Sequence, residues 1–428
     1  MKFRTGTLLV SLLLLFLWVV PRTRAQEVPP STQPVKLSDL LVEAERNNPE
    51  IQAARQAWLS AQQVSTQIST LPDPQVVLQH LSVGSPRPFA GYSNSDFAYV
   101  GLGFSQDIPY PGKLRLRGEI AKKDADVWQQ QFESVRRVVL TGVKTAYSQL
   151  AYLSKRRAIL QDDRQLLQQV EQATEARYRS GMGNQQEIIQ AQLQQTRLLR
   201  EITENELERG KVQAELKQLL NRAQSSPDVE TLELRETAVT HSYDELLAAA
   251  KTNNPEIAGA QKMVEKQGLQ VDLARKDFYP DFNLQYMWQR TDPTQFRAYY
   301  MVTFGVRVPI YRKRKQQPEL AQAQTDQDRA RSEYQMQSQR VAFELRQQYL
   351  DAEKSEELLK IYREGMLPQA RAELQAGLAA YQSNRLEFQA LLTSFLDVLK
   401  LDEEYWQTLS EHEIAFSQIE GITGLSLR

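Results

Sequence analysis

The 428-residue sequence contains no cysteine and only three histidines. The missing cysteine excludes disulfides, thiolate metal sites, a cysteine nucleophile and a lipidated N-terminal cysteine. His80, His241 and His412 lie far apart and form no ligand pattern. Neither a glycine-rich phosphate loop nor a nucleophile elbow occurs. We therefore expect no enzyme activity, no cofactor and no metal site.

Glycine and proline are also scarce, with 18 of each. Gln, Ala, Leu, Glu and Arg dominate long stretches, which is typical of long helices with few turns. The formal net charge is only -1. A nucleic-acid surface would need a clustered basic face to replace condensed counterions, so we expect no nucleic-acid partner.

Only one long apolar run occurs, from Leu8 to Val20, and it follows Lys2 and Arg4. Pro21 and a small-residue stop ending at Ala25 come after it. The run is shorter than the roughly 20 residues that span a bilayer as a helix, which argues against the alternative of an uncleaved anchor. The pattern predicts a signal peptide over residues 1–25, hence an exported chain.

The pentapeptide NNPEI occurs twice, at Asn47–Ile51 and at Asn253–Ile257. The sequences around both copies align without a gap, residues 40–80 against residues 246–286, and each motif is expected to lie within one helix. We interpret the chain as a tandem duplication. Its two repeats are expected to span residues 26–222 and 223–428.

After each repeated helix the period changes at a proline, and two extended stretches separated by a polar loop follow. The first stretches are Val76–Leu81 and Phe282–Trp288, and the second begin at Ala98 and Ala298. Apolar residues alternate with small or polar ones, which suits a barrel wall between lipid and water. An amphipathic hairpin on a soluble core is the alternative. The residues expected to face lipid are Val100, Leu102, Phe104, Leu284, Tyr300, Val302 and Phe304.

The rest of the first repeat is predicted to form two antiparallel helices. Lys113–Arg179 has almost no glycine or proline, and apolar residues recur every seven positions along it. A turn follows, in which Gly181 can supply a left-handed backbone, and a second helix returns over Gln185–Leu220. The heptad residues are Val143, Ala146, Leu150, Leu153, Leu160 and Leu167.

The second repeat shows the same scheme. A long helix is expected from about Glu319 to Ala380, starting at Pro318 and broken or kinked at Pro368. A turn over Tyr381–Arg385 precedes a return helix over Glu387–Ile419.

In this order the segments resemble the TolC-like outer-membrane efflux proteins, the exit ducts of Gram-negative tripartite pumps and type I secretion systems. The resemblance rests on the duplicated NNPEI helix, on the strand ends DIPYPGK and VPIYRKRK, on ARYRSGMGNQQEIIQAQ and on LPQARAELQAGLAAYQSNRLEFQALL. It implies a mainly α fold with a small β part. Long antiparallel helical hairpins would form a periplasmic α-barrel, and four strands per subunit would join a trimeric twelve-stranded transmembrane β-barrel.

The resemblance also implies partners and sites. A homotrimer in outer-membrane lipid would extend into the periplasm and receive substrates from a periplasmic adaptor and an inner-membrane pump. The last quoted stretch is similar to ducts that serve heavy-metal exporters of the RND class. Glu187, Tyr381 and Arg385 would form a periplasmic gate. The adaptor-docking turns would contain Gly181, Gly183 and Asn384.

Two questions stay open at the level of sequence. The sequence contains no Met, His or Cys cluster that could select a soft metal, which weakens the case for metal efflux. The substrate therefore stays open among a metal, a drug, a solvent and a peptide. A secreted or periplasmic structural coiled-coil protein would share the heptads and the signal peptide. Outer-membrane fractionation would distinguish it from a duct. A general diffusion porin does not fit, because porin strands fill the sequence.

Overall fold

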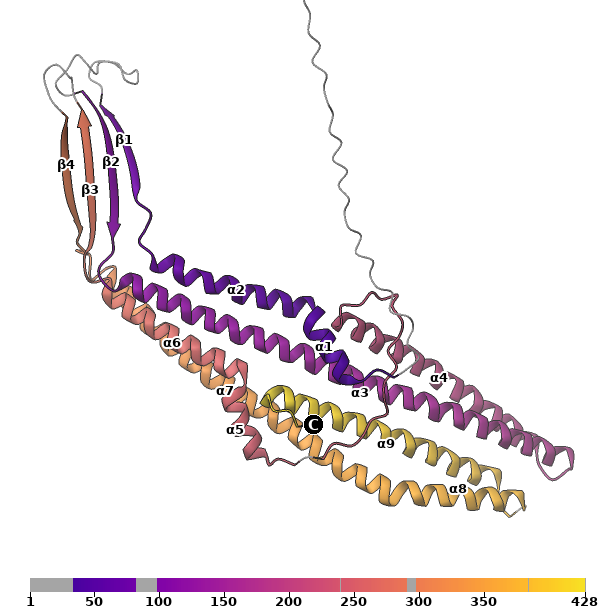
Figure 1. The fold of residues 1–428 in the computed structure, drawn as a ribbon. Coiled ribbons are helices and arrows are strands. Elements are labelled where there is room, and N and C mark those ends of the chain that lie inside the picture. The colour runs from indigo at the N-terminus through magenta and orange to yellow at the C-terminus, as the bar shows by residue number, and fades with distance from the viewer. Residues whose placement is uncertain (1–33, 82–97, 239, 291–297, 384, 428) are drawn as a thin grey trace, which may run out of the picture.

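The computed structural model describes residues 34–81, 98–238, 240–290, 298–383 and 385–427. The predicted signal peptide and most of both polar loops lie outside the described residues. A bundle of long helices extends from one end of a small sheet, and no helix covers either face of that sheet in the described part (Figure 1).

The two halves of the chain carry the same order of elements. The first half contains α1 (Leu37–Asn47), α2 (Pro49–Ser69), β1 (Gln75–Leu81), β2 (Tyr99–Ile108), α3 (Lys113–Arg179) and α4 (Gln185–Leu219). The second half contains α5 (Tyr243–Asn253), α6 (Pro255–Lys276), β3 (Asp281–Arg290), β4 (Tyr299–Arg307), α7 (Gln316–Ile361), the π-helix η1 (Tyr362–Met366), α8 (Leu367–Gln382) and α9 (Phe388–Thr423). The predicted long helices and strands are therefore confirmed, with ends within a few residues.

The second asparagine of each NNPEI motif starts a helix. The side-chain oxygen of Asn48 accepts hydrogen bonds from the backbone N–H groups of Glu50 and Ile51, at 2.9 and 3.2 Å. Pro49 disfavours a helical Asn48, whose backbone is extended. The expectation of one helix around each motif was therefore wrong, because α1 and α5 end there and α2 and α6 begin.

The same asparagines hold the ends of the return helices. The side-chain amide of Asn48 donates to the carbonyl of Leu219 at the end of α4, at 2.9 Å. The amide of Asn254 donates to the carbonyl of Ile422 near the end of α9, at 3.0 Å. Each motif thus joins two helices whose sequence separation is large, which explains why both repeats contain it.

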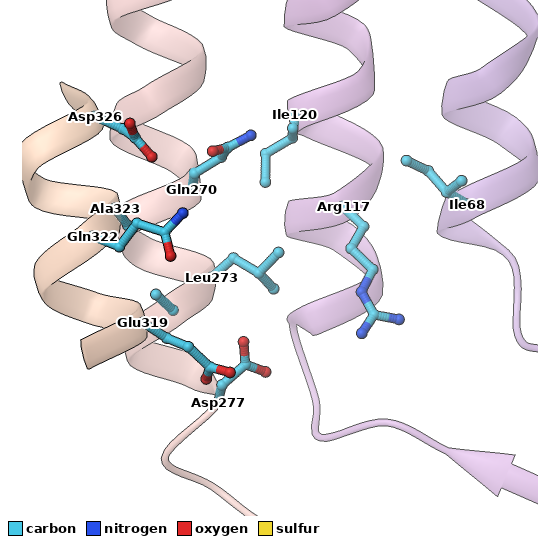
Figure 2. A pocket seen from close by; sticks show the side chains of 11 residues that line it. Ile68, Arg117, Ile120, Gln270, Leu273, Asp277, Glu319, Gln322, Ala323 and Asp326 are labelled. Atoms are coloured by element: carbon cyan, nitrogen blue, oxygen red, sulfur yellow. The ribbon is translucent and has the colours of Figure 1, made fainter. Parts of the chain in front are cut away.

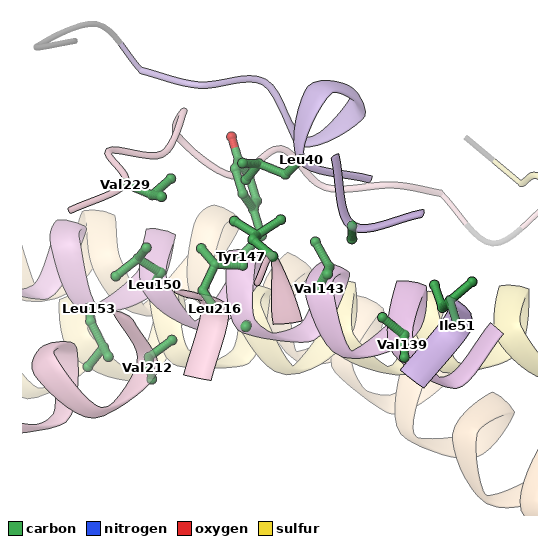
Figure 3. Close-up of a cluster of buried hydrophobic side chains, with 13 residues drawn as sticks. Leu40, Ile51, Val139, Val143, Tyr147, Leu150, Leu153, Val212, Leu216 and Val229 are labelled. Atoms are coloured by element: carbon green, nitrogen blue, oxygen red, sulfur yellow. The ribbon is translucent and has the colours of Figure 1, made fainter. Parts of the chain in front are cut away.

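The heptad residues of α3 form the core of the bundle. All six predicted positions are buried, and they divide between two clusters along the helix. In the cluster of Figure 3, Val143 and Leu150 pack with Leu40 of α1 and Leu216 of α4. The hydroxyl of Tyr147 donates to the carbonyl of Val35 at 3.0 Å, so α3 also holds the chain before α1.

The long helix of the second half is interrupted before Pro368, as predicted. Proline has no N–H group, and its ring would clash with the carbonyl four residues earlier in a regular helix. The regular α-helix is therefore replaced there by the π-helical turn η1, in which the N–H of Leu367 donates to the carbonyl of Tyr362. Pro318 lies in the first turn of α7, also as expected.

The four strands form one antiparallel sheet in the order β1-β2-β3-β4, so the β2–β3 pair joins the two halves. The register places Val76, Phe104, Tyr286 and Val302 in one row across the sheet. The neighbouring row on the same face is Leu78, Leu102, Trp288 and Tyr300. The sheet therefore has one broad apolar face, and its side chains are largely exposed.

A buried lysine connects the sheet to the helices. Lys113, the first residue of α3, is only 2% exposed. Its ammonium group lies 3.0 Å from a carboxylate oxygen of Asp277 and 2.9 Å from one of Asp281. The backbone N–H of Tyr110 donates to the same oxygen of Asp281 at 2.8 Å. These contacts join the chain between β2 and α3 to the end of α6 and the start of β3.

Candidate functional site

The turn between α3 and α4 and the turn between α8 and α9 lie together at the end of the bundle that is remote from the sheet (Figure 1). At the first turn Gly181 has φ +74°, the left-handed conformation predicted for it. Its N–H donates to the carbonyl of Tyr178 at 3.0 Å, and the N–H of Met182 donates to that of Arg177 at 2.9 Å. This Schellman pattern closes α3 within two residues.

Gly183 and Glu187 complete the first turn. A side chain at Gly183 would come within 3.2 Å of the backbone nitrogen of Tyr178, so the position is tight. Glu187 lies in the first turn of α4, where its N–H donates to the side chain of the N-cap residue Asn184 at 3.1 Å. A carboxylate is favourable there because the helix N-terminus carries a partial positive charge.

The second turn has a similar closure. The N–H of Arg385 donates to the carbonyl of Ala380 at 2.8 Å, over the same number of residues as the Met182 to Arg177 bond. Asn384, the residue predicted for docking, lies outside the described residues. The side chain of Arg385 is exposed and makes no hydrogen bond or ion pair within the described part of the chain.

Tyr381 connects the two turns from a buried position. Its hydroxyl donates a long hydrogen bond of 3.4 Å to a carboxylate oxygen of Glu187. Burial raises the pKa of Tyr381, and the negative charge of Glu187 raises it further. The hydroxyl therefore stays protonated and remains a donor. The structure thus brings two of the three predicted gate residues together in one chain, but it does not bring Arg385 to them.

Arg177 is a tip residue that was not predicted from the sequence. Its guanidinium lies over the Tyr381 ring, 4.4 Å from the ring centre, and donates to the carbonyl of Tyr381 at 2.8 Å. A second bond of 3.3 Å reaches the carbonyl of Met182. Arg177 therefore contacts both turns. A cation in the last turn of a helix favours such carbonyl contacts, and that signal is present in the sequence.

Apolar packing supports the tip. The rings of Tyr381 and Phe388 lie 6.1 Å apart. Leu167 and Leu198 of the first hairpin pack in one cluster with Leu391 of α9. The two hairpins thus form one packed unit at the end of the bundle remote from the sheet. The contacts of Tyr381 with Arg177 and Glu187 lie beside this unit, at the turns.

The predicted lipid-facing residues lie at the other end of the molecule. Leu102, Phe104, Leu284, Tyr300, Val302 and Phe304 are all exposed, and Val100 is half-buried. The opposite face of β2 is crowded instead, because Gly101 and Gly103 lie against the buried side chain of Met287. The alternation of the sequence therefore corresponds to two chemically different faces.

Groups suited to catalysis or metal binding are scarce. Within the described ranges, no three His, Cys, Asp or Glu side chains gather as a metal site would need. His412 is buried, and its ring nitrogens lie 2.7 and 3.2 Å from the carbonyl oxygens of Thr237 and Ala352, a structural contact. Among the described helices, none combines the length and hydropathy that a membrane span requires.

Comparison with known proteins identifies the class. The family model for outer membrane efflux proteins matches residues 40–222 and 246–386, which is most of the chain. The chain belongs to this family. It is therefore an outer-membrane efflux component that extends into the periplasm, and the structural coiled-coil alternative is not favoured. Members of the family are transport channels that work as trimers with adaptor and pump partners.

Solved structures share the fold. The outer-membrane channel OprN is 17% identical, with a TM-score of 0.79 over 91% of this chain and 90% of that one. VceC from Vibrio cholerae is 17% identical, with a TM-score of 0.77 over 92% and 97%. The open state of MtrE from Neisseria gonorrhoeae is 14% identical, with a TM-score of 0.77 over 92% and 90%. The comparison with curated proteins gives no match.

Proposed function

We propose that this chain forms the passive exit duct of a tripartite efflux pump and has no enzymatic activity of its own. Three copies would each give four strands to a closed transmembrane barrel and their helices to a periplasmic tunnel. The apolar sheet face and the outer edges of β1 and β4, which have no partner strand in the described chain, support this assembly. Closure would remove both edges. The two repeats, residues 26–222 and 223–428, would give the tube a quasi-sixfold wall.

The tip is the proposed contact with the partners. Both turns lie at the end remote from the sheet, and the side chain of Met182 is exposed there. A periplasmic adaptor would bind the turns around Gly181, Gly183 and Asn384, and an inner-membrane pump would supply the energy. The similarity of the α8–α9 segment to ducts of heavy-metal exporters favours a pump of the RND class.

Lengthening the first turn tests this function. Inserting two residues between Met182 and Gly183 should abolish export in cells, because the turn could no longer present the same surface. Assembled trimer in the outer membrane should stay at the normal level. The same insertion between Thr240 and His241, exposed residues of the linker before α5, is the control and should leave export intact. Full export by the Met182 variant would contradict docking at the tip.

We also propose that Glu187, Tyr381 and Arg385 hold the tip closed, together with Arg177. Glu187 and Arg177 both act on Tyr381 within one chain. Arg385 is exposed, and in a trimer its guanidinium would be accessible to an acidic group of a neighbouring subunit.

Glu187→Ala and Arg177→Gln should each raise the single-channel conductance in planar bilayers several-fold. The double variant should add little to the larger single effect, because both substitutions disrupt contacts of Tyr381. Arg179→Gln is the control, since Arg179 is exposed and pairs with Glu175 of its own helix, at 3.1 Å. Conductance that stays normal in both single variants would show that other contacts close the tunnel. Arg385→Ala tests the contact between subunits in the same assay.

A further inference from the structure

A run of four cations follows β4, and we name residues Arg312, Lys313, Arg314 and Lys315 the basic turn. All four side chains are exposed. Within the described residues none of them makes a side-chain hydrogen bond or an ion pair. The backbone nevertheless forms a hydrogen-bonded turn, because the N–H groups of Arg314 and Lys315 donate to the carbonyl of Tyr311 at 3.0 and 2.9 Å.

The corresponding segment of the first repeat is neutralised. Lys113 aligns with Lys313, but it is buried between two carboxylates. Arg115 aligns with Lys315, and it pairs with Glu119 at 2.6 Å. The other two positions of the basic turn correspond to Gly112 and Leu114 in the first repeat. The unpaired charge is therefore specific to the second copy, and the duplicated fold itself does not require it.

Nearby acidic groups do not compensate for this charge. The first acidic residue after the basic turn is Glu319, which lines a hollow of about 310 Å³ together with Asp277 and Arg117 (Figure 2). Further along α7, Arg331 pairs with Asp328 at 2.9 Å, and Arg329 also has acidic neighbours. Three arginines of α7, Arg329, Arg331 and Arg340, thus have acidic partners within the helix, whereas the cations of the basic turn have none among the described residues.

The basic turn directly continues the apolar face of β4. Tyr300, Val302, Phe304 and Val306 are exposed along the strand, and Val308, Ile310 and Tyr311 continue the exposed apolar surface at 55%, 72% and 69%. The order from β4 to α7 is therefore aliphatic and aromatic residues, then a tyrosine, then four cations. A bilayer presents hydrocarbon, interface and charged headgroups in the same order.

We propose that the basic turn binds the headgroups of phospholipids with net negative charge in the periplasmic leaflet of the outer membrane. The inference rests on the proposed function, which places the apolar sheet face in lipid. Clustered Lys and Arg side chains at a membrane surface attract anionic lipid, and the attraction weakens with added salt. This contact would help to fix the depth of the sheet in the membrane. An acidic surface of a periplasmic protein is the competing occupant.

Native mass spectrometry of the full-length protein in detergent tests this proposal, with phosphatidylglycerol and phosphatidylethanolamine of identical acyl chains as probes. The variant Arg312→Gln/Lys313→Gln/Arg314→Gln/Lys315→Gln removes the charge and keeps the length of the side chains. Its affinity for phosphatidylglycerol should be lower by about tenfold or more, and its affinity for phosphatidylethanolamine should be unchanged. The matched control Arg329→Gln/Arg331→Gln/Lys354→Gln/Lys360→Gln removes the same charge from exposed positions of α7 and should bind as the wild type does.

Several results would overturn the proposal. Equal binding of the two lipids by the wild type would show that the headgroup charge is not recognised. An unchanged preference for phosphatidylglycerol in the quadruple variant would place any lipid site elsewhere. If that variant kept the preference but lost a complex with the adaptor, the occupant would be a protein. Failure of the wild type to fractionate with the outer membrane would instead refute the proposed duct.

Discussion

Arginine at Leu102 or at Val302 should sharply reduce the assembled trimer in the outer membrane. Both side chains are more than half exposed, on the apolar face of the sheet. If that face contacts lipid, a cation at mid-depth costs about 2 to 4 kcal/mol. The measurement is the free energy of unfolding in urea after refolding into lipid vesicles, together with the trimer level in isolated outer membranes.

Thr303→Arg is the matched control. Thr303 is exposed and neighbours Val302 in β4, but its side chain is on the opposite face, so the substitution should be much milder. The sequence alone suggests Gly103 as an equivalent control. The structure makes Gly103 unsuitable, because a Cβ there would lie 2.5 Å from the terminal carbon of Met287. Equal losses for Val302→Arg and Thr303→Arg would refute the assignment of a lipid-facing side.

Lys113→Met should destabilise the folded chain by about 2 to 3 kcal/mol. The substitution leaves the carboxylates of Asp277 and Asp281 beside each other without their cation. Loss of one partner from a fully buried pair costs about 3 to 5 kcal/mol. The expected value is smaller because both carboxylates remain partly exposed. Urea unfolding in detergent measures the change, and Lys122→Met, at an exposed position of the same helix, should have little effect.

A compensating variant distinguishes charge from packing. Lys113→Met combined with Asp277→Asn and Asp281→Asn removes all three charges while keeping an acceptor for the N–H of Tyr110. This triple variant should recover most of the lost stability. If it is no more stable than Lys113→Met alone, the lysine acts through packing and the charge argument is wrong.

Periodic and local signals in the sequence predicted most of the fold. The bounds of α3 follow from the absence of proline and the scarcity of glycine between Lys113 and Arg179, and Gly181 has the expected left-handed backbone after the helix end. The break before Pro368 follows from the missing N–H group. The helix division at Asn48 was missed, although a residue before proline disfavours helix, because the apolar pattern continues through it.

Contacts between distant segments were not predictable from the residue pattern, and the Glu187–Tyr381 contact was expected only from the family resemblance. Arg177 is one of many arginines in α3, and only the approach of the α8–α9 turn places Tyr381 beneath it. Asp163 is similar. The packing of α3 against α9 buries its carboxyl group, which, with Asp402 nearby, raises its pKa to about 7. Periodicity indicates which face of a helix is buried, but it does not indicate which helix will cover that face.

The pairing of β2 with β3 has a consequence for how the chain acquires its structure. During synthesis and export, β1 and β2 emerge well before β3, because α3 to α6 lie between them. A β1–β2 hairpin that forms early would therefore expose the edge of β2, together with its apolar side chains, until β3 is available to pair with it. Pairings of such long sequence separation form slowly, and exposed edges of this kind aggregate. We therefore expect the folding yield in the periplasm to depend on protection of that hairpin until the second half arrives.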